Sequence, residues 1–100
     1  MVITMQTISE IKTAFLPVFE EYNVRKAVLF GSYAKGCAVE ESDIDLLVDS
    51  GLGGFNFFGL YESLAERVSK KLELFDVSEI DKNSRVDNEI RATGLVIYEK

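Results

Sequence analysis

The sequence predicts an α/β or α+β domain in which one sheet is covered by helices. Stretches with the helical spacing of apolar residues alternate with short apolar runs that are typical of strands, and glycine-containing turns separate them. The strand-like runs are residues 27–30, 43–48, 72–77 and 95–98. At 100 residues the chain has room for one domain, which we expect to span residues 1–100.

The first helix is predicted by its cap and by its apolar spacing. Thr7 and Glu10 match the T-x-x-E capping box, and apolar residues then recur at three- and four-residue steps as far as Tyr22. Because Pro17 lies inside this pattern, we expect a kink there or a break near Leu16.

A flexible connection and two further helices complete the expected elements. We expect the connection to cover residues 51–59, a helix to run from about residue 60 to residue 71, and a short last helix to end at Gly94. The connection holds three aromatic residues that could cap the core or leave an apolar patch for a partner: Phe55, Phe57 and Phe58.

Composition excludes several classes of function. Eleven basic and seventeen acidic residues give a net charge of −6, so nucleic acid is an unfavourable partner. The chain has no histidine, which excludes a Ser-His-Asp triad and a histidine-ligated zinc site. The single cysteine, Cys37, excludes an internal disulfide and fits a reducing compartment. With no membrane-spanning stretch or signal peptide in view, we expect a cytoplasmic protein.

Two aspartates interrupt a strand that is otherwise strongly apolar. Asp43 and Asp45 alternate with Ile44 and Leu46, so both carboxylates are expected on one face. A divalent cation such as Mg²⁺ would neutralise the pair, since Mg²⁺ prefers carboxylate and phosphate oxygens. A solvated pair at the edge of a strand is the alternative.

A small turn follows the strand that ends at Phe30. Gly31 lets a ligand approach the main chain, and Ser32 adds a hydroxyl, so this turn can offer N–H and O–H donors to a phosphate. The alternative is an ordinary strand-to-helix turn with Ser32 as the N-cap.

Together these two features resemble a family pattern. Gly-Ser-Tyr-Ala-Lys-Gly at residues 31–36 and Ser-Asp-Ile-Asp-Leu-Leu-Val at residues 42–48 resemble the G-S-x-A-x-G and S-D-x-D-L-x-V motifs of the polymerase-β-type nucleotidyltransferases. The spacing is similar to that of the minimal nucleotidyltransferases, the MNT antitoxins that accompany HEPN-type ribonuclease toxins. The resemblance implies the nucleotidyltransferase fold, with one mixed sheet of about four strands and flanking helices.

The resemblance also implies roles for particular residues. Gly31 and Ser32 would hold the nucleotide phosphates, and Asp43 and Asp45 would bind Mg²⁺. A third carboxylate would complete the metal site or act as the base, and Glu73 is our candidate for it.

Two departures from the family pattern leave alternatives open. Relatives often carry aspartate where this chain has Glu73, and Asp76 is the second choice for the third carboxylate. Many relatives carry arginine where this chain has Lys35, which is either a phosphate-binding cation or an exposed lysine.

The implied activity is Mg²⁺-dependent transfer of a nucleoside monophosphate to a hydroxyl of a partner protein. AMP from ATP is the expected donor chemistry, with another NTP as the alternative, and the expected partner is a HEPN-type toxin. The second hypothesis is a catalytically inactive antitoxin or nucleotide-binding module that acts by binding its partner, with the charge of −6 favouring a basic surface. The oligomeric state is left open.

Overall fold

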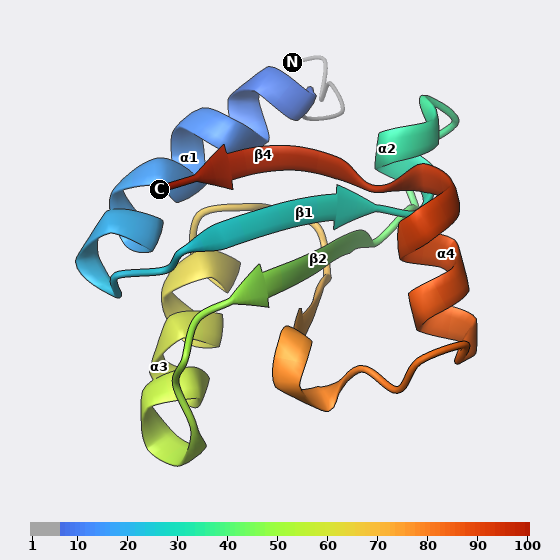
Figure 1. Ribbon diagram of the computed structural model, residues 1–100. Helices are drawn as coiled ribbons and strands as arrows, with labels where there is room; N and C mark the ends of the chain where they lie inside the picture. Colours follow the sequence, from blue (N-terminus) through green and yellow to red (C-terminus); the bar gives the residue numbers. More distant parts are fainter. Residues whose placement is uncertain (1–6) are drawn as a thin grey trace, which may run out of the picture.

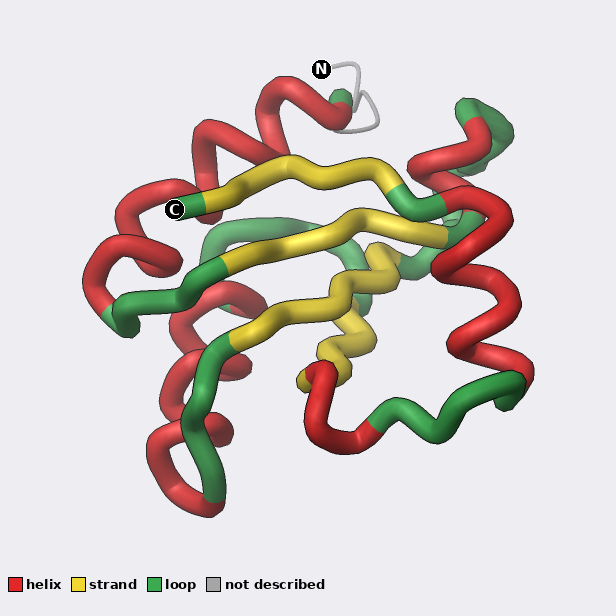
Figure 2. The backbone as a smooth tube through the Cα atoms, viewed as in Figure 1, coloured by secondary structure: helices red, strands yellow, loops and turns green. Residues whose placement is uncertain are grey.

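The computed structural model describes residues 7–100, and these form the predicted alternation of helices and strands (Figures 1 and 2). The elements in chain order are α1 (Ile8–Glu21), β1 (Lys26–Phe30), α2 (Ser32–Lys35), β2 (Ile44–Asp49), α3 (Gly54–Ala65), β3 (Leu72–Asp76), the 3₁₀ turn η1 (Val77–Glu79), α4 (Arg85–Thr93) and β4 (Leu95–Glu99).

The four strands form one mixed sheet in the order β3-β2-β1-β4. Strand β1 is antiparallel to both β2 and β4, whereas β2 and β3 are parallel. Figure 1 shows α1 and α3 covering one face of the sheet, with α2 and α4 at the end where β1 finishes. The fold class and the mixed four-stranded sheet that the sequence predicts are therefore confirmed.

The core lies between the sheet and the two covering helices. Alternate residues of each strand point into it, as the two-residue period of a strand requires. Its fully buried members include Phe15 and Phe19 of α1, Leu29 of β1, Leu46 of β2 and Leu64 of α3. The next residues along the strands lie on the opposite face, which leaves that face available for a site.

Helix α1 begins as predicted and runs through Pro17 without a break. The Thr7 hydroxyl accepts from the Glu10 N–H at 3.1 Å, and the Glu10 carboxylate accepts from the Thr7 N–H at 2.8 Å. The expected break near Leu16 is wrong. Pro17 is on the exposed side of the helix, so water can solvate the Thr13 carbonyl that lacks its helical donor.

Helix α3 begins earlier and ends earlier than predicted. It includes the three aromatics that we expected in a loop, and it ends at Ala65 rather than near residue 71. Gly53 is its N-cap, so the glycines begin the helix instead of forming a long connection. Phe57 packs on the core, whereas Phe55 is 94 % exposed and Phe58 is 57 % exposed.

The predicted third strand is shorter than expected, because Val77 belongs to the turn η1 that follows β3. None of the helices within residues 7–100 is both long enough and apolar enough to span a membrane.

Candidate nucleotide site

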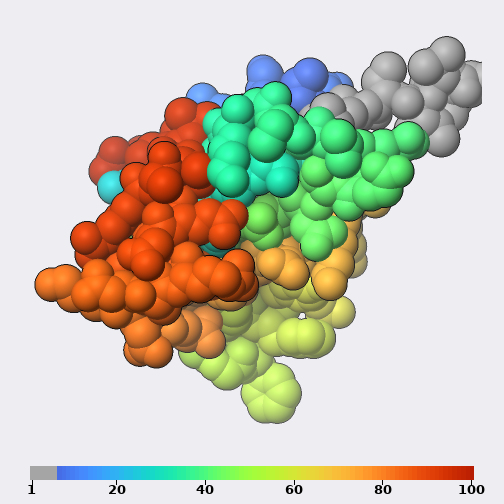
Figure 3. All heavy atoms as spheres, turned by 90° about the vertical axis from the view of Figure 1, so that its right-hand side faces the viewer, coloured from blue at the N-terminus to red at the C-terminus, as the bar shows by residue number. Residues whose placement is uncertain are grey.

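The candidate residues meet at one end of the sheet. The end of β1, the starts of β2 and β3, helix α2 and the end of α4 all lie there (Figures 1 and 3). The mixed topology produces this arrangement, because an antiparallel strand finishes where its neighbour begins. In the strand register Phe30 is opposite Asp45, and Asp45 is opposite Glu73, so the three side chains share one sheet face.

Three other carboxylates lie close enough to Asp45 to affect its charge. Asp43 directly precedes β2, Asp45 is on the strand, Glu73 is its register partner on β3, and Glu89 approaches from α4. Burial raises the pKa of Asp45 to about 7, helped by a hydrogen bond with Glu73 and by the negative charges of Glu73, Glu89 and Asp43. The site therefore favours a proton or a cation on this carboxylate.

Glu89 is the residue that the sequence analysis missed. A Cβ built on Gly31 would lie 3.2 Å from its Oε1, so Glu89 faces the turn that follows β1. Its Oε2 pairs with Arg85 Nη1 at 3.6 Å, one helical turn earlier. The spacing of Val86 and Ile90 predicts the helix, but nothing local in the sequence places that helix beside Gly31.

The turn after β1 requires glycine for two reasons. Gly31 has φ +78° and ψ −149°, a region that side chains make unfavourable, and a Cβ there would collide with Asp45 Oδ2. The Gly31 carbonyl accepts from the Lys35 N–H at 3.0 Å, which starts α2. Its own N–H is not free for a ligand, since it donates to Thr93 Oγ1 at 3.1 Å.

Ser32 and Lys35 occupy the ends of the short helix α2. Ser32 is half-buried, and within residues 7–100 its hydroxyl makes no hydrogen bond, so that hydroxyl can serve a ligand. The Lys35 side chain is exposed and forms no ion pair with any described residue.

Asp76, the second choice for the third carboxylate, is directed away from the site. It is on the core side of β3 and only 3 % exposed. It accepts from the hydroxyls of Ser50 and Ser78, each at 2.6 Å, and from their N–H groups. Burial acts to raise the pKa of Asp76, but these hydrogen bonds outweigh it and hold the pKa below its usual value.

The donor set suits Mg²⁺ in part. Carboxylate oxygens are its preferred protein ligands, and one or two of them commonly suffice when phosphates and water complete the coordination. Among residues 7–100, no three His, Cys, Asp or Glu side chains are grouped so that they could hold an ion. Asp43 and Asp45 therefore fit as a pair that a nucleotide would complete, rather than as part of a finished three-carboxylate centre.

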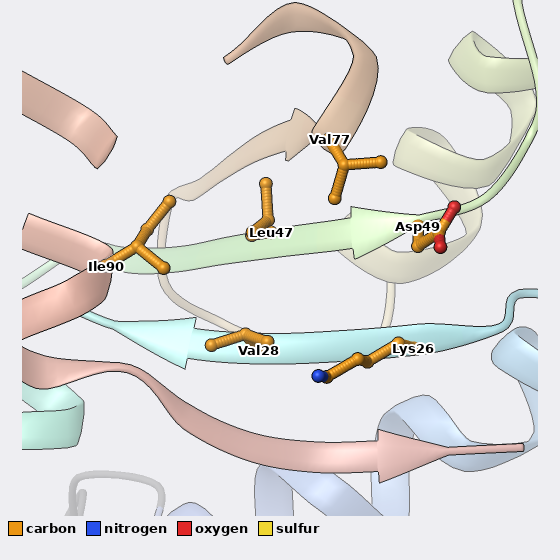
Figure 4. A pocket seen from close by; sticks show the side chains of 6 residues that line it. All are labelled: Lys26, Val28, Leu47, Asp49, Val77 and Ile90. Atoms are coloured by element: carbon orange, nitrogen blue, oxygen red, sulfur yellow. The ribbon is translucent and has the colours of Figure 1, made fainter. Parts of the chain in front are cut away.

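A cavity of about 370 Å³ lies on the same sheet face, farther along the strands. Figure 4 shows Val28, Leu47 and Ile90 grouped at one end of it and Lys26 and Asp49 at the other. Because Val28 and Leu47 are each two residues from Phe30 and Asp45, the cavity and the carboxylates belong to one surface.

The fold and the site define a nucleotidyltransferase. The chain matches the family described as "Polymerase beta, Nucleotidyltransferase" over residues 10–100, and it belongs to that family. Its curated relatives include "Putative protein adenylyltransferase MJ1379" of Methanocaldococcus jannaschii, 39 % identical over 70 % of this chain and 74 % of the relative. Protein adenylyltransferase MntA of Thermococcus cleftensis is 44 % identical over 47 % of this chain and 48 % of the relative.

Solved structures confirm the fold. A crystal structure of a toxin-antitoxin with AMP-PNP aligns with a TM-score of 0.74 and 19 % identity, over 89 % of this chain and 73 % of that one. A structure of a tri-AMPylated Shewanella oneidensis HEPN toxin in complex with MNT antitoxin aligns with a TM-score of 0.69 and 17 % identity, over 92 % and 72 %. The family match confirms the resemblance to the polymerase-β-type nucleotidyltransferases, and these two structures show the same fold.

Proposed function

We propose that this chain is a Mg²⁺-dependent protein adenylyltransferase that moves AMP from ATP to a hydroxyl of a partner protein. The observation that carries the proposal is the pairing of Asp45 with Glu73 beside the Gly31–Ser32 turn. A phosphate-binding turn and an acidic pair on one sheet face are what nucleotidyl transfer requires of a protein.

The proposed reaction is a displacement at the α-phosphorus of ATP. The acceptor oxygen forms a bond to the α-phosphorus, the bond from that phosphorus to the bridging oxygen breaks, and pyrophosphate leaves. The acceptor hydroxyl gives up its proton as the new bond forms. We assign its acceptance to Glu73, whose side chain is only partly buried beside Asp45.

Each further residue has a role that follows from its position. The Ser32 hydroxyl, which is free within the described chain, donates to a β- or γ-phosphate oxygen. Asp43 and Asp45 hold Mg²⁺, which when bound neutralises charge on the phosphates. Lys35 is close enough in sequence to Ser32 to add positive charge near the phosphates.

The partner is proposed to be a HEPN-type toxin. Relatives of this chain are named protein adenylyltransferases, and one structure of the same fold contains an AMPylated HEPN toxin. The net charge of −6 would speed docking on a basic protein surface.

Labelled ATP tests the proposal. The protein is incubated with Mg²⁺, a candidate partner and ATP labelled on either the α- or the γ-phosphate. Transfer of AMP predicts label on the partner from α-labelled ATP only. Label from γ-labelled ATP would mean that a phosphoryl group is transferred instead, and the proposal would be wrong.

The second candidate is an antitoxin that acts by binding alone. The observation that favours it is that residues 7–100 contain no preformed three-carboxylate centre. In that case calorimetry would detect tight binding to the partner but no Mg²⁺-dependent binding of ATP.

A further inference from the structure

Thr93 links the last turn of α4 to the turn after β1. Its Oγ1 accepts from the Gly31 N–H at 3.1 Å and donates to the Glu89 carbonyl at 2.8 Å. The direction of both bonds is fixed, because a carbonyl only accepts and a backbone N–H only donates. The one proton of the hydroxyl is therefore committed to the Glu89 carbonyl, and one of its two lone pairs accepts from Gly31.

The Gly31 N–H has few other ways to be satisfied. Gly31 is buried, so losing the Thr93 hydroxyl would leave a donor without water or protein to accept from it. The bond also fixes the plane of the peptide between Phe30 and Gly31. Because the carbonyl of Gly31 starts α2, rotation of the turn would move Ser32.

The end of α4 is held close enough to maintain this bond. A Cβ on Gly94 would lie 3.0 Å from Val28 Cγ1 and 2.5 Å from the Ile90 carbonyl oxygen, so only glycine fits there without displacement. Helix α4 contributes no fully buried residue to the core. Thr93 is thus a specific polar link between a peripheral helix and the candidate phosphate-binding turn.

We propose that Thr93 is a positioning residue for the nucleotide: its hydroxyl holds the Gly31 peptide so that Ser32 meets the phosphates. The inference rests on the proposed function and assigns to α4 a part in binding ATP. Thr93 itself donates to no phosphate in this proposal, since its one hydroxyl proton is used within the protein.

Two substitutions of Thr93 distinguish the contribution of its hydroxyl from that of the rest of the side chain. Thr93→Val keeps the shape and removes the hydroxyl, whereas Thr93→Ser keeps the hydroxyl. Thr13→Val is the matched control, because Thr13 Oγ1 donates to the Ser9 carbonyl at 3.0 Å in the same helical manner but lies on α1. If Thr93→Val does not fold, Thr93→Ala replaces it.

The measurements are amide hydrogen exchange at Gly31 and the affinity for ATP with Mg²⁺. We expect Thr93→Val to speed exchange at Gly31 and to weaken ATP binding about tenfold, the size expected for one lost hydrogen bond. Thr93→Ser should restore both properties, and Thr13→Val should change neither.

The outcomes distinguish this inference from the proposed function. If the wild type binds ATP and Thr93→Val binds it equally well, the positioning role is wrong and the proposed function stands. If Thr93→Val only lowers the melting temperature, as a structural role would require, the inference is also wrong. If the wild type does not bind ATP with Mg²⁺, both are overturned.

Discussion

Asp45 and Glu73 are register partners across the parallel pair β2–β3, and burial, helped by the neighbouring Glu73 carboxylate, raises the pKa of Asp45 above its usual value. Both lie near the starts of their strands, at the end of the sheet where the antiparallel strand β1 finishes. The mixed sheet therefore brings an acidic pair and a glycine-serine turn together, although Gly31 and Glu73 are far apart in sequence.

The pKa of Asp45 predicts a pH-dependent effect of Asp45→Asn on stability. The carboxyl has a pKa of about 7 in the folded protein against an ordinary value of 3.8. Its protonated form therefore stabilises the fold fully below the ordinary value, and this contribution is lost as the pH rises through about 7. Asparagine stays neutral, so Asp45→Asn should raise the melting temperature in EDTA at about pH 8 and change it little at about pH 4.

Asp49→Asn is the control for this experiment. Asp49 is on the same strand but pairs with Arg25 at 3.1 Å, and it should show no such gain at high pH. A melting temperature for Asp45→Asn that stays at the wild-type value at both pH values would show that the charge on Asp45 does not destabilise the fold.

Gly31→Ala and Gly36→Ala separate backbone strain from steric collision. Both glycines have positive φ, +78° and +76°, so backbone strain alone should cost alanine about 1–3 kcal/mol of unfolding free energy at either site. At Gly36 the added Cβ meets nothing within 4 Å, whereas at Gly31 it collides with Asp45. Chemical denaturation should show a larger loss for Gly31→Ala, and calorimetry should show ATP binding lost only in that variant. Equal losses in the two variants would contradict the packing described at Gly31.

Glu73→Gln should lower the rate of transfer, whereas Asp76→Asn should lower the stability of the fold. Glu73 is at the site, so Glu73→Gln should lower the transfer rate by about 10²-fold or more with little change in stability. Asp76 accepts four hydrogen bonds in a nearly buried position, so Asp76→Asn should destabilise the fold by about 1–3 kcal/mol. Rates are measured well below the melting temperature of each variant.

The pKa of Asp76 also predicts how the stability lost in Asp76→Asn depends on pH. Its pKa lies below the usual value, so its stabilising contribution is present above that value and is lost as the pH falls. Asp76→Asn should therefore lose more stability near neutral pH than in acid. A transfer rate that falls in Asp76→Asn but not in Glu73→Gln would reverse the assignment of the third carboxylate.

Local patterns predict the parts of the fold that local forces determine. The capping box of α1 follows from Thr7 and Glu10, and the alternation of polar and apolar residues predicts β2. The two-residue period also predicts that Asp76 faces away from Glu73, as it does. These features need only neighbouring residues to be specified.

Features that depend on the order of the strands are not accessible in the same way. Glu89 and Thr93 reach the site only because β4 pairs with β1 and brings α4 to the end of that strand. The early start of α3 was missed because Gly53 and Gly54 are typical of loops, yet here they begin a helix whose residues Leu60 and Leu64 are buried. Packing on the sheet overrides the local preference.

The most direct test of the central claim is transfer by a variant that lacks the paired aspartates. Three purified proteins are compared: the wild type, the double variant Asp43→Asn/Asp45→Asn and the control Asp49→Asn. Each is incubated separately with Mg²⁺, α-labelled ATP and a lysate of the native host. The wild type and Asp49→Asn should label a protein band, and the double variant should fold normally and label none. Equal labelling by the double variant would contradict the account, because the label would then not depend on the site at Asp43 and Asp45.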